Sequence, residues 1–265
     1  MSNRLPIRGM FLAALAVAGC AGPRAEGAGA RQVQLGMAAQ LGERGDWAAS
    51  FAAADAVVRE DPTDPTALVL RARALRHQGM YGEAEADLRR VLGQTPGNAA
   101  AHSELGLVCE RTARPAEALE HHRRAHELAP GQPRYTNNLA FALLVRGTGR
   151  EAVPLLEEAL RIEPGSERLR NNMGFALAST GDFRGADRQF RMAGTPAQAA
   201  ANLGFAYERA GNLAQAYEQY VRAVRMDPAA DRPRANLAHV ARELGRDVPA
   251  ELAPPPAPAV EKGGS

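Results

Sequence analysis

The sequence predicts an all-α protein that consists of about six stacked helix-turn-helix units and a final capping helix. Three similar stretches support this fold class: NNLAFALL, NNMGFALA and ANLGFAY, which begin at residues 137, 171 and 201. They share an Asn, a small residue and a Phe in a fixed order. Extended in both directions, this register gives a repeat of about 34 residues, the length of a unit of two antiparallel helices.

Each unit has a small residue in both of its helices and a proline at its close. The small residues, at positions 8 and 20, let the two helices approach closely, and the proline stops the second helix because it cannot continue the hydrogen-bond ladder. The units span residues 31–64, 65–98, 99–132, 133–166, 167–196 and 197–230, and the fifth is shorter than the others. Position 8 holds Ala38, Ala72, Gly106, Ala140, Gly174 and Gly204, position 20 holds Ser50, Ala84, Ala118, Ala152, Ala186 and Ala216, and the closing prolines are Pro62, Pro96, Pro130, Pro164, Pro196 and Pro228.

This pattern closely resembles the tetratricopeptide repeat (TPR) family, over about 200 residues. The resemblance implies a right-handed superhelix, or α-solenoid, with a concave groove. Residues 231–246 repeat only a first helix, with Leu237 and Ala238 at positions 7 and 8. A lone first helix is the expected cap, because an unpaired last unit would expose its apolar face. The TPR domain is therefore expected to span residues 31–246.

Residues 1–19 are typical of a signal peptide. Arg4 and Arg8 precede an apolar run, Met10 to Ala18, that is too short to cross a bilayer. The residues before Cys20 resemble a bacterial lipobox, which implies cleavage ahead of Cys20 and acylation of that residue. An ordinary signal peptide followed by a chance cysteine is the alternative. By the same resemblance, Ala21 favours delivery to the periplasmic face of the outer membrane.

Two further segments carry no packable apolar stripe. Residues 20–30 are rich in Gly and Ala and are expected to form a flexible, lipid-anchored tether. Residues 247–265 are Pro-rich and are expected to form a disordered tail.

Composition and motifs exclude several functions. The net charge of +2 is small and the basic residues are spread over every unit, so no nucleic-acid partner is predicted. Signal, tether, repeats, cap and tail account for the 265 residues, and no complete catalytic motif is found. The stretch from Gly147 to Ala152 reads GTGREA, but it follows a helix where a dinucleotide loop would follow a strand. The sequence therefore predicts no enzyme, no cofactor and no small-molecule substrate.

The third unit contains a histidine cluster: His102, His121, His122 and His126. His122 and His126 are four residues apart and so share one helical face, as a metal site would require. No Glu lies between them as in a zinc protease helix, and His122 occupies a packing position. We therefore predict no metal site, although a third, enzymatic interpretation would need one.

The candidate site is the concave groove. At 100° per residue, positions 2, 6, 9 and 13 of each first helix point away from the core, toward the groove of a TPR superhelix. The predicted partner-binding residues are Arg134 and Arg168 at position 2, Asn138, Asn172, Asn202 and Asn236 at position 6, and Phe141, Phe175 and Phe205 at position 9. The Asn row either hydrogen-bonds an extended peptide or is only typical of the family. The Phe row either anchors a partner or packs on itself.

The order and size of the parts resemble the TadD lipoproteins of Tad (Flp) pilus systems and the PilF/PilW/Tgl pilotins. This resemblance implies a non-enzymatic adaptor that binds a secretin or another pilus assembly component. An NlpI-like adaptor for periplasmic peptidoglycan hydrolases is the alternative, because TPR function depends on groove residues and not on the fold.

Overall fold

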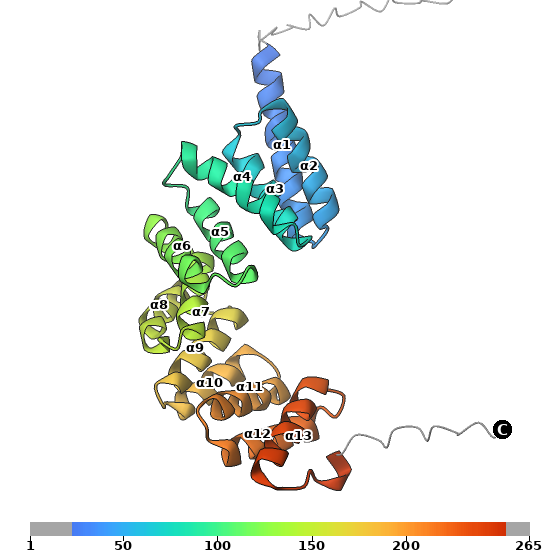
Figure 1. Cartoon of the computed structure of the whole chain (residues 1–265), viewed down its shortest axis with the longest axis vertical. Coiled ribbons are helices and arrows are strands. Elements are labelled where there is room, and N and C mark those ends of the chain that lie inside the picture. The colour runs from blue at the N-terminus through green and yellow to red at the C-terminus, as the bar shows by residue number, and fades with distance from the viewer. Residues whose placement is uncertain (1–22, 253–265) are drawn as a thin grey trace, which may run out of the picture.

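The computed structural model describes residues 23–252, with side chains from residue 29 onward, and its regular elements in that range are all helices (Figure 1). The helices are α1 (Pro23–Glu43), α2 (Trp47–Glu60), α3 (Pro65–His77), α4 (Tyr81–Gln94), α5 (Ala99–Arg111), α6 (Pro115–Leu128), α7 (Pro133–Val145), α8 (Gly149–Ile162), α9 (Glu167–Ser179), α10 (Phe183–Ala193), α11 (Pro196–Arg209), α12 (Leu213–Met226), α13 (Asp231–Leu244) and the short 3-10 helix η1 (Ala250–Leu252). The predicted all-α class is confirmed.

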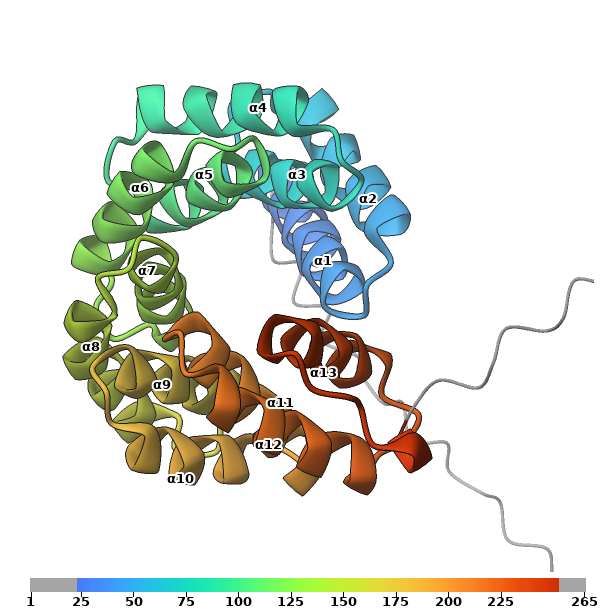
Figure 2. The same cartoon turned by 60° about the horizontal axis from the view of Figure 1, so that its bottom comes forward.

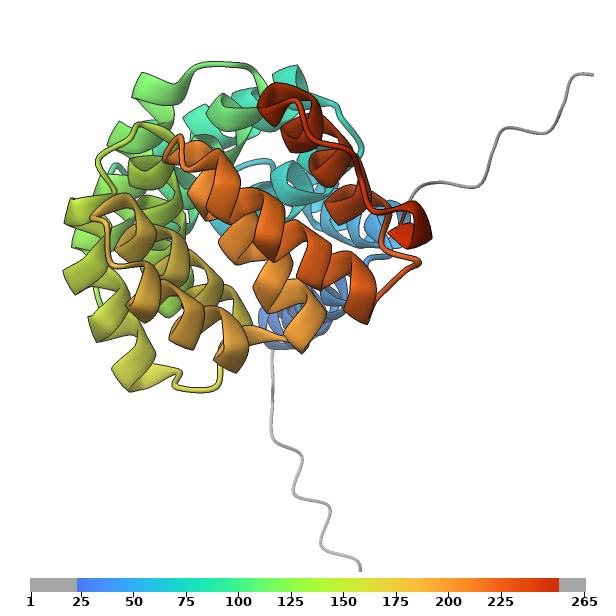
Figure 3. The ribbon, with the colours of Figure 1, turned by 90° about the horizontal axis from the view of Figure 1, so that it is seen from below.

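The helices wind into a superhelix. Odd-numbered helices lie on the inside and even-numbered helices on the outside of the coil (Figure 2). In this view the chain turns counter-clockwise as it approaches the viewer, so the superhelix is right-handed, as expected. Seen from below, the C-terminal helices lie in front of the N-terminal ones, which shows that the path advances along the axis and does not close into a ring (Figure 3).

Every unit turns between its two helices through one residue with a left-handed backbone. These residues all occupy position 15: Gly45, Gly79, Gly147, Gly181 and Gly211, with φ between 76° and 91°, and Ala113, with φ 58°. Glycine adopts this conformation without a steric penalty, whereas alanine does not. The turn of the third unit is therefore strained in a way that the others are not.

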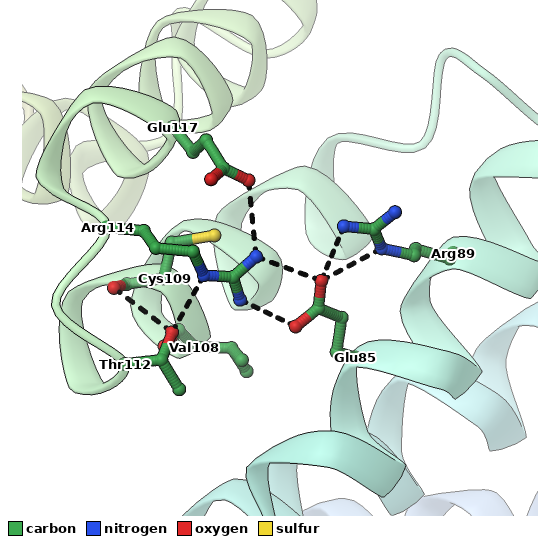
Figure 4. A network of polar contacts seen from close by, with 7 residues as sticks. All are labelled: Glu85, Arg89, Val108, Cys109, Thr112, Arg114 and Glu117. Atoms are coloured by element: carbon green, nitrogen blue, oxygen red, sulfur yellow. Dashed lines mark hydrogen bonds and ion pairs between the residues drawn. The ribbon is translucent and has the colours of Figure 1, made fainter.

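A polar network surrounds this strained turn (Figure 4). The guanidinium of Arg114 donates to Glu85 of the preceding unit, with Nη2 2.5 Å from Oε2, and to Glu117 at 3.2 Å. Its Nε donates to the hydroxyl of Thr112 at 3.0 Å. These contacts tie both sides of Ala113 to neighbouring helices, which is the condition under which strained backbone persists.

The fifth unit departs from the predicted boundary. Its second helix, α10, has 11 residues where the second helices of the other units have 14. Pro196, expected to close this unit, instead takes the first position of α11, and Thr195 and Gln198 form a capping box around it. Proline is well suited to this position because its missing N–H would have no partner there in any case.

Both ends of the described range differ from the predictions. Residues 23–30, expected as a flexible tether, are the first turns of α1, which suits their alanines, the strongest helix formers. Within the predicted tail, Leu252 is buried against α12 and α13 together with Val248. The Tyr217 hydroxyl also donates to the Asp247 carbonyl at 2.9 Å. Residues 247–252 thus cover the last helix, because their apolar side chains pack against the apolar face of α13.

The signal peptide, Cys20 and residues 253–265 lie outside the described residues. Within the range that is described, no helix is both long enough and apolar enough to span a membrane.

Candidate functional site

An apolar groove of about 490 Å³ runs across the inner helices α7, α9 and α11. Its walls include Phe141, Phe175 and Phe205, one from each helix, together with Asn172 and Arg209. The rings of Phe141 and Phe205 are 45% and 42% exposed, which is high for such large apolar side chains. The three phenylalanines at position 9 therefore do converge on one concave surface, because successive first helices lie side by side.

Phe175 is more deeply placed than its position in the repeat suggests. Its ring makes edge contacts with Phe190 and Phe205, with centroids 4.9 and 5.9 Å apart. Phe190 is buried and lies over the backbone of Gly174, so its edge reaches Phe175 from the core side. Phe175 is thus half-buried and links core to groove, contrary to the expectation that position 9 simply points away from the core. Along the Phe row, Phe141 and Phe205 are exposed, and Phe175 packs against Phe205.

A second cavity, of about 850 Å³, adjoins the first toward the C-terminal end. The two share Phe175 and Phe205, and the second adds Asn202 and Asn236. Six of the nine predicted groove residues thus line one of two connected cavities. Arg134, Asn138 and Arg168 line neither of them.

The asparagines at position 6 form a ladder between neighbouring units. Their Nδ2 groups donate to the residue at position 5 of the preceding unit: Asn138 to Ser103 at 3.2 Å, Asn172 to Asn137 at 2.9 Å and Asn202 to Asn171 at 2.9 Å. Asn236 donates to the hydroxyl of Tyr220 at 3.1 Å. The amide groups therefore hold adjacent first helices in register, and a bound peptide would find one donor of each already engaged. The paired Asn residues in the sequence were the signal for this ladder.

A cluster of charged residues occupies the N-terminal half of the concave face, and sequence reasoning missed it. Glu104, at position 6 of the third unit, is 2% exposed. Arg76 donates to it at 3.1 Å, and Arg73 and Arg134 lie within 4.0 Å. Three arginines from two helices, α3 and α7, thus surround one buried carboxylate on α5. Arg168, one unit beyond Arg134, is exposed.

The histidine cluster is divided between separate contacts. His102 and His121 lie with their Nδ1 atoms 3.0 Å apart, and burial together with His102 lowers the pKa of His121. His122 is fully buried and contacts Glu110, whereas His126 contacts Thr136. Among the described residues, no group of three or more His, Cys, Asp or Glu side chains is arranged to hold a metal ion.

The repeated helix pairs and the concave groove define a helical-repeat interaction scaffold. Family models described as tetratricopeptide repeat match residues 35–99, 78–133, 134–162 and 197–229, which together make up more than half of the chain. The chain belongs to the tetratricopeptide repeat family. Proteins of this fold bind protein or peptide partners and are typically non-catalytic. A search of curated proteins found no match.

Solved structures share the fold at low sequence identity. PilW, a widely conserved type IV pilus biogenesis factor, matches with a TM-score of 0.64 and 18% identity, over 78% of this chain and 98% of PilW. PilF of Pseudomonas aeruginosa matches with a TM-score of 0.62 and 17% identity, over 80% of this chain and 98% of PilF. YrrB, a TPR protein with an unusual peptide-binding site, matches with a TM-score of 0.56 and 21% identity, over 72% of this chain and 97% of YrrB.

Proposed function

We propose that this protein is a lipid-anchored adaptor on the periplasmic face of the outer membrane, where it binds a protein partner and supports assembly of a pilus or secretion machine. The groove between α7, α9 and α11 is the binding site. The observation that carries the proposal is the pair of exposed rings, Phe141 and Phe205, in that groove. Aromatic anchors in a concave apolar surface are typical of partner-binding hot spots.

The pilus role draws on the proteins that share the fold. PilW is described as a type IV pilus biogenesis factor, and YrrB as having a peptide-binding site. The predicted signal peptide and lipobox fit an outer-membrane lipoprotein of the same size class. A secretin or another pilus component is the partner that we favour.

Site-specific photo-crosslinking tests the partner. A benzophenone amino acid at position 205 preserves an aromatic ring in the groove, and mass spectrometry identifies its adducts in intact cells. Ile162, which is 50% exposed on the outer helix α8, is the matched control position. We expect a secretin or pilus component to be captured from position 205 and not from position 162.

Two results would contradict this proposal. Capture of a cell-wall hydrolase from position 205 would establish the alternative adaptor role in the same groove. Equal capture from positions 205 and 162 would show that the groove is not the interface.

Metabolic labelling with a palmitate analogue tests the anchor. The wild-type protein should be labelled and recovered with the outer membrane. The Cys20→Ser variant should be neither labelled nor recovered with the outer membrane. Cys109→Ala is the control, because Cys109 is a fully buried free thiol and its loss should leave labelling intact. Persistent labelling of Cys20→Ser would disprove the anchor.

A further inference from the structure

We infer that Arg73 and Arg134 form a carboxylate-binding site in the N-terminal half of the concave groove, and that the partner carries an acidic side chain near the apolar one that enters the Phe groove. This inference rests on the proposed function, since it names the chemistry of the partner for the same surface. Nothing in the TPR pattern itself places a charge cluster here. It follows from contacts among α3, α5 and α7.

The two arginines face the same carboxylate oxygen without hydrogen-bonding to it. Arg73 Nε lies 3.8 Å and Arg134 Nη1 lies 4.0 Å from Oε1 of Glu104, whereas N–H···O hydrogen bonds have distances of about 2.7 to 3.2 Å. The other oxygen, Oε2, accepts from Arg76 at 3.1 Å. Arg73 Nε is also buried without any hydrogen-bond partner. The buried Nε of Arg73 is closed to a ligand, but the partly exposed side chains still offer Nη donors: Arg134 Nη2 donates to the Tyr135 hydroxyl at a long 3.4 Å, and Arg134 Nη1 makes no hydrogen bond to Glu104.

The local charge is unbalanced. In units two to six, positions 2, 6, 9 and 13 hold five arginines, Arg73, Arg111, Arg134, Arg168 and Arg209, and one acidic residue, Glu104. The first unit adds Glu43 at position 13, so over all six units these positions carry three more arginines than acidic residues, while the whole chain has a net charge of only +2. Glu104 neutralises one of the three arginines around it. A second carboxylate would relieve the repulsion between the remaining two.

Both arginines are partly exposed, unlike the carboxylate between them. The side chains of Arg73 and Arg134 are 27% and 42% exposed, while that of Glu104 is 3% exposed. The planar fork of arginine matches the geometry of a carboxylate, and the cluster already accommodates one in Glu104. An acidic side chain is therefore the ligand group that this site fits.

The nearby Phe groove indicates that the ligand is a protein segment and not a small anion. Arg134 and Phe141 lie on the same helix, seven residues apart, which corresponds to about 10 Å along its axis. An extended peptide covers that distance in about three residues. A helical segment needs about seven. The partner should carry its acidic and apolar residues at one of these two spacings.

Synthetic peptides test the inference by fluorescence anisotropy with the purified protein. Each peptide has a Leu flanked on both sides by Glu, at a distance of three residues in one series and seven in the other. Matched peptides carry Gln or Lys in place of Glu. We expect a Glu peptide to bind about tenfold more tightly than its Gln counterpart, as for one charge-assisted pair, and the Lys peptide to bind least.

Three variants separate the two parts of the surface. The ratio of the Kd of the Gln peptide to that of the Glu peptide should fall to about one in Arg134→Gln. The same ratio should be unchanged in Arg161→Gln, which lies on the outer helix α8. Phe141→Asp should weaken both the Glu and the Gln peptides. Circular dichroism confirms that each variant is folded.

The outcomes are distinguishable. Equal binding of the Glu and Gln peptides, with loss in Phe141→Asp, would overturn this inference and leave the proposed function standing. An unchanged Glu advantage in Arg134→Gln would also overturn it. Complete competition by inorganic phosphate, with no requirement for Leu, would make this a small-anion site. Failure of every peptide to bind the wild-type protein would count against both proposals.

Discussion

The ring of Phe190 lies over the backbone of Gly174, so close that a Cβ at Gly174 would stand 2.7 Å from Cζ of Phe190. The same relationship joins Gly106 to His122 and Gly204 to Tyr220. In the units with Ala at position 8, the facing position 24 holds Ala54, Leu88 and Leu156. Position 8 is thus glycine in the units where position 24 carries a ring, so the residues at these two positions pack as a matched pair.

Gly174→Ala should destabilise the protein by about 1 to 3 kcal/mol, because the added methyl displaces the buried Phe190 ring. The shift in the urea denaturation midpoint, followed by circular dichroism, measures this loss. Gly82→Ala is the control: a Cβ at that helical position meets nothing within 4 Å. It should be neutral or stabilising, since alanine favours the helix. Equal midpoints for the two variants would contradict the packing argument.

Ala113→Gly should stabilise the protein by up to about 1 kcal/mol, because glycine removes the penalty of a left-handed backbone. Ala113 is the only residue among the six position-15 turn residues that is not glycine. The reverse change in the next unit, Gly147→Ala, should cost a similar amount. Urea denaturation of both variants measures the pair. A loss of stability in Ala113→Gly would show that the network around Arg114 depends on the alanine.

Glu85 should make stability depend on acidic pH. The hydrogen bond from Arg114, aided by that from Arg89, holds the pKa of Glu85 below its ordinary value of about 4.5. The stabilisation is complete above the ordinary pKa and is lost as pH falls through the lower folded-state pKa. Wild-type protein should therefore exceed Glu85→Gln in stability near neutral pH, and the difference should vanish in acid.

Thermal unfolding of the two proteins across the acidic range checks this. The control is Glu158→Gln on the outer helix α8, where Glu158 is exposed. It should leave the pH profile of the wild type unchanged. A constant difference between wild type and Glu85→Gln down to the lowest pH would rule out the ion pairs as its source.

Phe141→Asp should abolish capture of the partner and leave stability nearly unchanged, because the ring is 45% exposed. Phe175→Asp should reduce both the capture of the partner and the stability of the protein, since Phe175 contacts the buried Phe190. Crosslinking yield and urea midpoint, measured for both variants, distinguish these effects. Ile162→Asp is the control for adding a charge at an exposed apolar position. Normal capture by Phe141→Asp would remove that ring from the binding site.

The regular elements were predictable because their causes are local. The 34-residue period, the small residues at positions 8 and 20 and the turns at position 15 each act within one unit. The polar contacts of the residues at position 24 also correlate with a sequence feature. Glu occurs at position 12 only in the units whose ring is polar, where Glu110 contacts His122 and Glu208 accepts from Tyr220. Such pairs lie 12 residues apart and follow from helix pairing alone.

Predictions failed where the environment of a side chain is set by another unit. Phe175 was expected to face only the groove, but Phe190 approaches it from the core side. The Asn row was expected either to hydrogen-bond a peptide or to be only typical of the family, yet its donors bind the preceding unit. Leu252 belonged to a Pro-rich stretch whose burial depended on the uncovered face of α13. In each case the deciding contact comes from outside the local pattern.

The sequence by itself determined the helical repeat, the handedness implied by its resemblance and the row of phenylalanines on one face, since helical periodicity fixes which residues share a face. Only the tertiary structure decided what those faces do. In the folded chain Phe141 and Phe205 are exposed and Phe175 is half-buried. The fold also gathers Arg73, Arg76 and Arg134 around Glu104. These arginines are separated by as many as 61 positions in the chain. The stacking of successive units, and not any local preference, brings their charges together.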